Sequence, residues 1–365
     1  MQTLLVNRSD PSDVSLVTQD APPLDEGEVR LSLDSFALTA NNVTYMIFGD
    51  QIGYWRYFDP KAYGFGEDHQ GRMPVWGFAT VSESRCEAVP SGTEVYGFFP
   101  VADELTVRPG KITPQGFQDV ADHRVALHPV YNSYSYTATD PSYAVQKDIQ
   151  PVLRPLFLTS FLIDDFLASG SFFDAQRVVL TSASSKTALG TAYCLKQRAS
   201  VEVLGLTSAR NRDFVAGTGY YDTVVTYEMI EGLDKVPTVI VDMAGNGALL
   251  SRLYAHLRGN VKYGCAVGKS HHDGDAAPRS AIEKSGGAPM TMFFAPDYAK
   301  SRIAEWGMAG FTERLSERWI PFLNDAAQWM EVGAPRRADA MMAAYRDLLE
   351  GAVDPRRASL FTLKG

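Results

Sequence analysis

The chain has 365 residues, 45% of them hydrophobic, which is enough for two domains with well-buried cores. Its 34 basic and 43 acidic residues give a net charge of -9, which argues against nucleic acid and anionic membrane surfaces as partners. No apolar stretch approaches the roughly 20 residues that span a bilayer, and the N-terminal residues lack the apolar core of a signal peptide, so we expect a cytoplasmic protein with no membrane segment.

Residues 29–130 contain short runs rich in β-branched and aromatic residues, separated by turn residues, and this pattern predicts a β-barrel or sandwich. Residues 49–74 interrupt the runs with many glycines, prolines and aromatics and with no helical period. We interpret them as a long surface excursion that forms a lid or the mouth of a site. Apolar residues at roughly helical spacing in residues 152–172 then predict a helix that marks a change of domain.

Beyond this helix, continuous apolar runs alternate with helical patterns. Apolar strands interleaved with helices predict a parallel sheet covered on both faces, as in a Rossmann-type doubly wound fold. We therefore expect a first domain at residues 1–150, a Rossmann domain at 151–299, and a C-terminal part, about 300–365, that returns to the first domain. The expected strands are residues 177–182, 200–207, 221–227, 236–245 and 261–268, and the expected helices are residues 185–198, 209–217 and 248–259.

The first strand-to-helix turn of this region, TSASSKTALG, contains no glycine until the helix is under way. A diphosphate usually lies against a glycine-rich turn at a helix N-terminus, because glycine lets the backbone approach closely. Here Ser182, Ser184 and Ser185 keep the turn small, Ser185 or Thr187 can cap the helix, and Lys186 adds a positive charge. We interpret the turn as a diphosphate site in which hydroxyls replace some backbone contacts. The competing interpretation is an ordinary capped turn that binds nothing.

The end of the second strand indicates which dinucleotide would bind. NAD-binding domains usually place Asp or Glu there, whereas a 2′-phosphate repels an acid and favours Ser, Thr or Arg. This strand is followed by Ser208, Arg210 and Arg212, and Glu202 stands near its start, away from the expected cofactor. The sequence therefore favours NADPH. The alternative is that both arginines are only solvated helix residues.

Four segments share a pattern with a known superfamily: GEVRLSLDSFALTANNVTYMIFGD, SGTEVYGFFP, VIVDMAGNG and VKYGCAVG. They resemble the medium-chain dehydrogenase/reductase superfamily, and within it the zinc-independent quinone oxidoreductase-like and enoyl reductase-like members. A closer likeness, through LRPLFLTSFLIDDFL, VLTSASSKTALG and GLTSARN, is to an uncharacterised bacterial group in that superfamily. The resemblance implies a GroES-like β-barrel domain joined to a Rossmann domain, with NADPH as the cofactor.

The resemblance also implies where the cofactor would lie. The nicotinamide would lie beside Met243, Gly245, Val267 and Gly268, whose backbone groups would bind its carboxamide, and Tyr227 would lie near the adenosine. Dimers formed through the edges of Rossmann sheets are common in the superfamily, so residues 261–268 could supply such an edge, although a monomer is also compatible with the sequence.

The sequence departs from the zinc-dependent members of the superfamily. Those members carry a Gly-His-Glu motif and an early catalytic cysteine, whereas the corresponding stretch here reads Trp76-Gly77-Phe78 and no early cysteine is present. The three cysteines are far apart in sequence, without the paired spacing of a structural zinc site. We therefore expect no bound metal.

Hydride transfer without a metal requires a polarised acceptor and a hydrogen-bond or proton donor. The resemblance places Tyr45 as that donor, with Asn42 as an orienting amide; a core tyrosine with a satisfied hydroxyl is the competing interpretation. The predicted activity is NADPH-dependent, metal-independent reduction of an activated alkene or a quinone, with an apolar or aromatic small molecule as the acceptor. Reduction of a ketone or aldehyde, and a non-catalytic nucleotide-binding protein of the same fold, are the alternatives.

Overall fold

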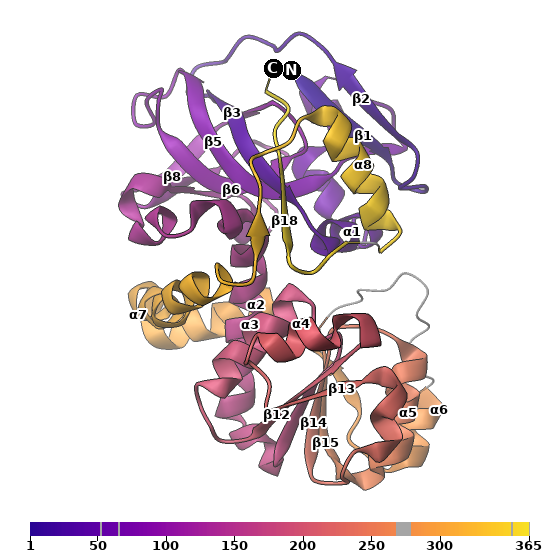
Figure 1. The fold of residues 1–365 in the computed structure, drawn as a ribbon. Helices are drawn as coiled ribbons and strands as arrows, with labels where there is room; N and C mark the ends of the chain where they lie inside the picture. The colour runs from indigo at the N-terminus through magenta and orange to yellow at the C-terminus, as the bar shows by residue number, and fades with distance from the viewer. Residues whose placement is uncertain (52, 65, 268–278, 352, 365) are drawn as a thin grey trace. The chain divides into compact units, whose positions relative to one another are not determined.

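The computed structural model describes residues 1–51, 53–64, 66–267, 279–351 and 353–364. The chain divides into two compact units (Figure 1): unit 1 comprises Met1–Val152 with Ala326–Gly365, and unit 2 comprises Leu153–Asp325. The return to unit 1 falls at residue 326 rather than at about 300. The reason is that helix α7 (Ala295–Ala326) packs on helix α2 (Gln150–Ser169) within unit 2, where Phe322 stacks on Phe157 with 4.6 Å between the ring centroids.

Unit 1 is built mainly from antiparallel strands. These strands are β1 (Gln2–Asn7), β2 (Val14–Thr18), β3 (Val29–Leu38), β4 (Gln70–Arg72), β5 (Pro74–Ser84), β6 (Glu94–Pro100), β7 (Glu104–Val107), β8 (Pro109–Thr113), β9 (Gly116–Asp119), β10 (Ser133–Tyr136), β17 (Glu331–Val332) and β18 (Arg357–Phe361). The large sheet has the order β17-β18-β3-β5-β6-β10-β9-β8, with β7 also paired to β3, and a smaller sheet has the order β2-β1-β4. Strand β18 pairs with β3, so the C-terminal strand belongs to a sheet that begins near the N-terminus.

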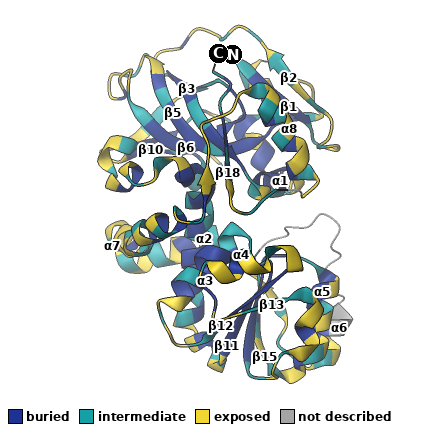
Figure 2. Cartoon of the chain, in the orientation of Figure 1, coloured by how far each residue is buried: buried dark blue, intermediate teal, exposed yellow. Residues whose placement is uncertain are grey.

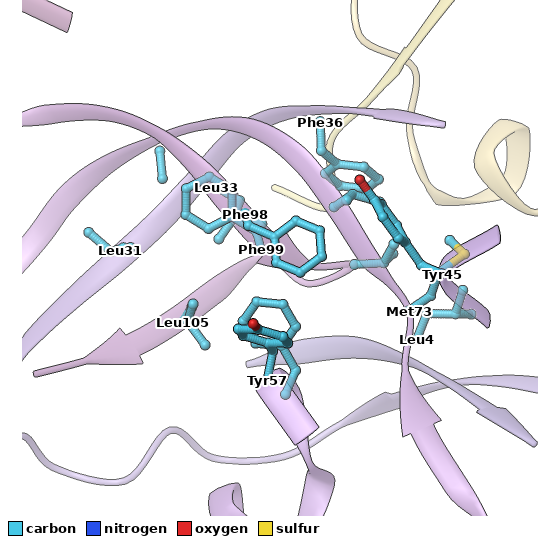
Figure 3. Packing of buried hydrophobic residues seen from close by; sticks show 14 of the residues in the cluster. Leu4, Leu31, Leu33, Phe36, Tyr45, Tyr57, Met73, Phe98, Phe99 and Leu105 are labelled. Atoms are coloured by element: carbon cyan, nitrogen blue, oxygen red, sulfur yellow. The ribbon is translucent and has the colours of Figure 1, made fainter. Parts of the chain in front are cut away.

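The long strands of unit 1 bury most of their residues, as their apolar and aromatic composition predicts (Figure 2). Figure 3 shows part of the resulting core, in which Leu33 of β3 and Phe98 and Phe99 of β6 share one cluster with Tyr45 and Tyr57. The strand-rich pattern that the sequence predicts for residues 29–130 is therefore confirmed. Two helices complete the unit, α1 (Ala40–Ile47) and α8 (Ala338–Leu349).

The interpretation of residues 49–74 as a surface excursion is wrong for their aromatic part. Trp55 and Phe58 lie in a short 3-10 helix and are 2% and 0% exposed. A Cβ atom on Gly49 would come within 2.0 Å of the Trp55 indole, and one on Gly71 within 2.4 Å of it. These two glycines therefore leave the space that the indole fills, and Trp55 and Phe58 serve the core rather than a lid.

Unit 2 contains a single parallel sheet among its described residues. Its strands are β11 (Arg177–Leu180), β12 (Glu202–Thr207), β13 (Thr223–Thr226), β14 (Thr238–Asp242), β15 (Val261–Ala266) and β16 (Met290–Met292). They lie in the order β13-β12-β11-β14-β15-β16, and every neighbouring pair is parallel. This is the Rossmann order, and it confirms the predicted doubly wound fold. Strand β15 is internal, so the expectation that residues 261–268 supply the sheet edge is wrong; β16 covers that side.

The order of the strands in unit 2 determines on which face of the sheet its helices lie. They are α2 and α7, α3 (Lys186–Lys196), α4 (Arg212–Gly217), α5 (Gly247–Leu257) and α6 (Arg279–Ser285). The chain moves from β11 toward β13 in one direction and from β14 toward β16 in the other, so right-handed crossovers place α3 and α4 on one face and α5 on the opposite face. Among the described residues, no helix is both long and apolar enough to cross a membrane.

Candidate functional site

The turn after β11 contains a residue in the left-handed backbone region, although it has no glycine. Ser182 adopts a left-handed conformation with φ of +50°, which is the region that glycine normally occupies in such turns. Ser185 is the N-cap of α3, where its hydroxyl accepts a hydrogen bond from the Ala188 N–H at 3.3 Å. The corner is pinned to the next strand, because the Ala183 N–H donates to the Leu206 carbonyl at 2.9 Å.

The structure places all five residues that the sequence predicts for the diphosphate at this corner. Ser182 and Ser184 lie in the turn, Ser185 caps the helix, and Lys186 and Thr187 are the first two residues of α3. Thr187 is not the cap, since its position lies inside the helix and its carbonyl accepts hydrogen bonds from the Ser160 and Thr191 hydroxyls. The N-terminus of α3 therefore combines a small turn, a hydroxyl cap and a lysine, as an anion site requires.

Residues from neighbouring segments form hydrogen bonds with the turn after β11, and the sequence did not predict these contacts. The Asn211 amide donates to the Ser184 hydroxyl at 3.0 Å, and the Tyr221 hydroxyl donates to the Ala183 carbonyl at 2.8 Å. Burial raises the pKa of Tyr227, and hydrogen bonds with the Ser182 backbone and side chain oppose that rise. Tyr227 thus contacts the turn itself. Asn211 directly follows the arginine motif, but nothing in the sequence signals Tyr221.

Among the described residues, the five that directly follow β12, from Ser208 to Arg212, include no carboxylate, and the first acid after them is Asp213. Ser208 precedes a short 3-10 helix that contains Arg210, and Arg212 begins α4. Both arginines are exposed. The Arg212 guanidinium lies 4.0 Å from the Asp213 carboxylate. Glu202 lies at the opposite end of the strand, where it pairs with Arg177 at 2.7 Å. The residues after β12 thus present cations and hydroxyls rather than an acid.

The loop after β14 is held by buried side chains. The Met243 N–H donates to the Thr181 hydroxyl, the Gly245 N–H donates to the Asp242 carboxylate, and the Val267 N–H donates to the Asp242 carbonyl. The backbone N–H groups at these three expected nicotinamide positions therefore have partners inside the protein, and only carbonyl oxygens there can face a ligand. Gly268, the fourth expected position, lies outside the described residues.

In unit 1, Tyr45 lies on α1 and is 4% exposed. Its hydroxyl oxygen accepts two hydrogen bonds, from the Asn41 amide at 2.7 Å and from the Trp76 indole N–H at 2.9 Å. Burial raises the pKa of Tyr45, so the phenol is neutral at physiological pH. With both lone-pair directions taken by donors, its own O–H hydrogen is left for a third partner.

Aromatic rings surround this tyrosine. The Tyr54 ring centroid lies 4.7 Å from that of Tyr45, and the Phe98 and Tyr131 centroids lie at 5.3 and 6.3 Å. The Tyr54 and Tyr131 hydroxyls are 3.0 Å apart. The surroundings of Tyr45 are therefore apolar and aromatic, with a few fixed hydroxyl groups.

The expectation that Asn42 faces an acceptor is wrong. Its amide oxygen accepts from the Thr39 N–H at 2.6 Å and its amide nitrogen donates to the Pro74 carbonyl at 2.8 Å, while the residue is 2% exposed. Asn42 therefore caps α1 and ties it to β5. Asn41, one residue earlier, is the asparagine that contacts Tyr45. The sequence offers two adjacent asparagines, and only the helix register decides between them.

The stretch that replaces the zinc-binding motif is packed into the strand core. The Trp76 ring stacks on Tyr96 at 5.6 Å, the Phe78 ring meets Tyr96 at 5.4 Å, and a Cβ on Gly77 would come within 2.2 Å of the Ser35 carbonyl. Within the part of the chain that the structure describes, no three His, Cys, Asp or Glu side chains cluster as a metal site would need.

Comparison with known proteins places these features in a wider group. The model of a family described as "Protein of unknown function (DUF2855)" matches residues 36–354. Curated proteins give no match to the sequence. The fold is similar to that of CurA from Vibrio vulnificus in complex with NADPH, at 13% identity over 100% of both chains with a TM-score of 0.64.

Two further solved structures share the fold. One is the quinone oxidoreductase from Thermus thermophilus, studied also as its complex with NADPH, at 14% identity over 100% of both chains with a TM-score of 0.56. The other is the CurK enoyl reductase, at 13% identity over 100% of this chain and 99% of that chain with a TM-score of 0.55. These likenesses confirm the predicted GroES-like and Rossmann domains of the medium-chain dehydrogenase/reductase fold.

Proposed function

Because the chain belongs to the DUF2855 family and has the medium-chain dehydrogenase/reductase fold, we propose that it is an NADPH-dependent, metal-independent reductase. It would transfer a hydride to an activated alkene, such as an enone or enoyl group, or to a quinone. The observation that carries the proposal is the corner after β11. There, Ser182 adopts the left-handed backbone conformation that glycine normally adopts, and Ser185 caps α3. This corner lies at the point where the strand order of a Rossmann sheet reverses.

The residues present fit NADPH better than NADH. Ser182, Ser184, Ser185, Lys186 and Thr187 would hold the diphosphate, through hydroxyls, backbone N–H groups and one cation at the N-terminus of α3. Ser208, Arg210 and Arg212 would hold the 2′-phosphate after β12. The two arginines, and the lack of an acid among the described residues from Ser208 to Arg212, support this assignment.

Bound NADPH supplies the hydride. Tyr45 would donate its O–H to the oxygen of the acceptor, and so withdraw electron density from the bond that is reduced. Its raised pKa makes it a hydrogen-bond donor that stays protonated rather than a group that ionises in each cycle, so the proton that completes the reduced product would come from water. The Asn41 and Trp76 donors fix the phenol oxygen, which keeps the direction of its hydrogen constant. The packed Trp76-Gly77-Phe78 stretch supports a reaction without zinc.

Cofactor binding tests the proposal directly. Lys186→Ala is expected to weaken NADPH and NADH alike, because the diphosphate is common to both, whereas Arg210→Ala is expected to weaken NADPH alone. A charge-assisted hydrogen bond contributes about 1.5–3 kcal/mol, which corresponds to roughly 10- to 100-fold in the dissociation constant. Isothermal titration calorimetry of each variant with both cofactors measures these constants.

The control for these substitutions is Arg252→Ala, which removes another arginine of unit 2 that pairs with Glu231 on the surface. It is expected to leave both dissociation constants unchanged. If the unmodified protein binds neither cofactor, the reductase proposal fails. Equal loss of NADPH affinity in Arg210→Ala and Arg252→Ala would remove the 2′-phosphate assignment.

The product distinguishes the possible reactions. Incubation with NADPH and an enone, followed by mass spectrometry and NMR, gives a saturated ketone if the alkene is reduced and an allylic alcohol if the carbonyl is reduced. If NADPH is oxidised in the presence of quinones but not in the presence of enones, the reaction is quinone reduction. Tight NADPH binding without turnover of any acceptor would leave a nucleotide-binding protein of this fold.

We also propose that the protein forms a homodimer through β16. This strand is the outer edge of the Rossmann sheet, and two side chains at it are exposed: Met292 at 75% and Phe294 at 41%. Met292→Arg is expected to shift the protein from dimer to monomer in size-exclusion chromatography with light scattering. The control Met308→Arg, at a similarly exposed methionine on α7, is expected to leave the dimer intact.

A further inference from the structure

A buried pair joins the two halves of the Rossmann sheet where the strand order reverses. Thr181 follows β11 and Asp242 ends β14, and these strands are neighbours in the sheet. The Thr181 hydroxyl donates to the Asp242 carboxylate at 2.6 Å, and the two residues are 0% and 2% exposed. None of the roles proposed above uses this pair.

Thr181 and Asp242 accept hydrogen bonds from the backbone N–H groups of residues 243–245, which follow Asp242. The Met243 and Ala244 N–H groups donate to the Thr181 hydroxyl at 2.9 and 3.2 Å. The Ala244 and Gly245 N–H groups donate to the two Asp242 carboxylate oxygens, both at 3.1 Å. Gly245 has φ of +63°, so a residue with a side chain would be strained in this turn. The loop after β14 is therefore fixed by side chains rather than by a ladder of backbone bonds.

The direction of these N–H groups determines what the loop offers on its other side. The described chain has no cis peptide bonds, and in a trans peptide the carbonyl points opposite to the N–H of the following residue. Since the Ala244 N–H group points to the pair, the Met243 carbonyl points away from it. That side of the loop presents this carbonyl as a hydrogen-bond acceptor, which attracts amide or hydroxyl donors and repels phosphate oxygens.

Resting on the proposed function, we infer that Thr181 and Asp242 are positioning residues for the carboxamide of the nicotinamide. A doubly wound sheet binds one mononucleotide on each side of the reversal, and the 2′-phosphate side is assigned to β12. The loop after β14 then faces the other mononucleotide. The NH₂ group of its carboxamide would donate a hydrogen bond to the outward Met243 carbonyl. The pair acts through the loop and does not itself touch the cofactor.

Thr181→Val tests the inference, because valine keeps the shape of threonine but can neither donate to Asp242 nor accept from the loop. The two ligands are NADPH and 2′-phospho-ADP-ribose, which has the same phosphates but no nicotinamide. Thr181→Val is expected to weaken NADPH about 10-fold and to leave 2′-phospho-ADP-ribose within about twofold of the unmodified protein. Thr181→Ser, which keeps the hydroxyl, is expected to bind both ligands as the unmodified protein does. Calorimetry measures all the constants.

Asp242→Asn provides a second variant of similar size, with one acceptor replaced by a donor beside the Gly245 N–H. Its dissociation constant for NADPH is expected to rise more than its dissociation constant for 2′-phospho-ADP-ribose, as in Thr181→Val. If both ligands weaken equally in both variants, the pair only maintains the fold and the inference is overturned; unchanged NADPH binding overturns it as well. If the unmodified protein binds neither ligand, the proposed function itself fails, a result that does not depend on either variant.

Discussion

Replacing Arg124 with methionine is expected to lower the free energy of unfolding of unit 1 by about 3–5 kcal/mol, because it leaves a buried carboxylate without its cation. The Arg124 guanidinium lies 3.3 Å from the Asp119 carboxylate, and both side chains are 0% exposed. It also donates to the Asn132 amide oxygen at 2.8 Å and to the Tyr131 carbonyl at 2.7 Å. Methionine satisfies none of these acceptors.

Urea denaturation measures the loss, and hydrogen exchange in β9 and β10 localises it to the segments that Arg124 joins. Arg252→Met, which breaks the exposed pair with Glu231, is the matched control and is expected to change stability little. The double variant Asp119→Asn with Arg124→Met removes both charges and is expected to recover part of the loss. Equal effects of the buried and exposed substitutions would show that the Arg124 network does not stabilise unit 1.

Replacing Tyr45 with phenylalanine is expected to lower kcat roughly 100-fold while the dissociation constant of NADPH stays unchanged, since one preorganised donor to a developing oxyanion is worth about that much. Steady-state kinetics with an enone or quinone, together with calorimetry, separates the two quantities. Because burial raises the pKa of Tyr45, its proton is retained above the ordinary tyrosine value of about 10, and this residue is expected to produce no fall in kcat between about pH 6 and about pH 9.5.

The matched control is Tyr57→Phe. Its ring lies 5.8 Å from Phe98, which Tyr45 also contacts, but its hydroxyl donates to the His128 carbonyl at 3.2 Å. This substitution is expected to cost about 1 kcal/mol of stability, the usual worth of one hydrogen bond, and to leave kcat unchanged. Similar losses of kcat in both variants would show that Tyr45 is a packing residue with a satisfied hydroxyl.

The Rossmann sheet could be predicted closely because its strands are short, continuous apolar runs separated by polar turns, a signal carried by neighbouring residues. The cap at Ser185 follows from the same local pattern. The edge of the sheet could not be predicted, because β16 is only Met290–Met292 and its pairing with β15 depends on distant contacts. The membership of α7 in unit 2 likewise depends on Phe322 meeting Phe157.

Contacts within one segment of the candidate site could be predicted from the sequence, and contacts between two segments could not. The residues from Ser182 to Thr187 are contiguous, so the sequence alone places them together at the turn before α3, and their role in binding a diphosphate stays a prediction. The Thr181 bond to Asp242 joins the ends of two strands, and the Trp76 bond to Tyr45 joins a strand to a helix. The assignment of Asn42 as the orienting amide failed because it required the phase of α1 to within one residue.

The pairing of β18 with β3 affects the order in which the protein can fold during synthesis. Unit 2 is a continuous stretch of chain and can complete its contacts as soon as it leaves the ribosome. Unit 1 must wait for β18, and until then residues 36–38 of β3 have no partner strand on that side. Unpaired strand edges are where strands from other molecules add and aggregation starts. Chains cut short before β18 are therefore expected to contain a folded Rossmann sheet in unit 2 and an aggregation-prone unit 1.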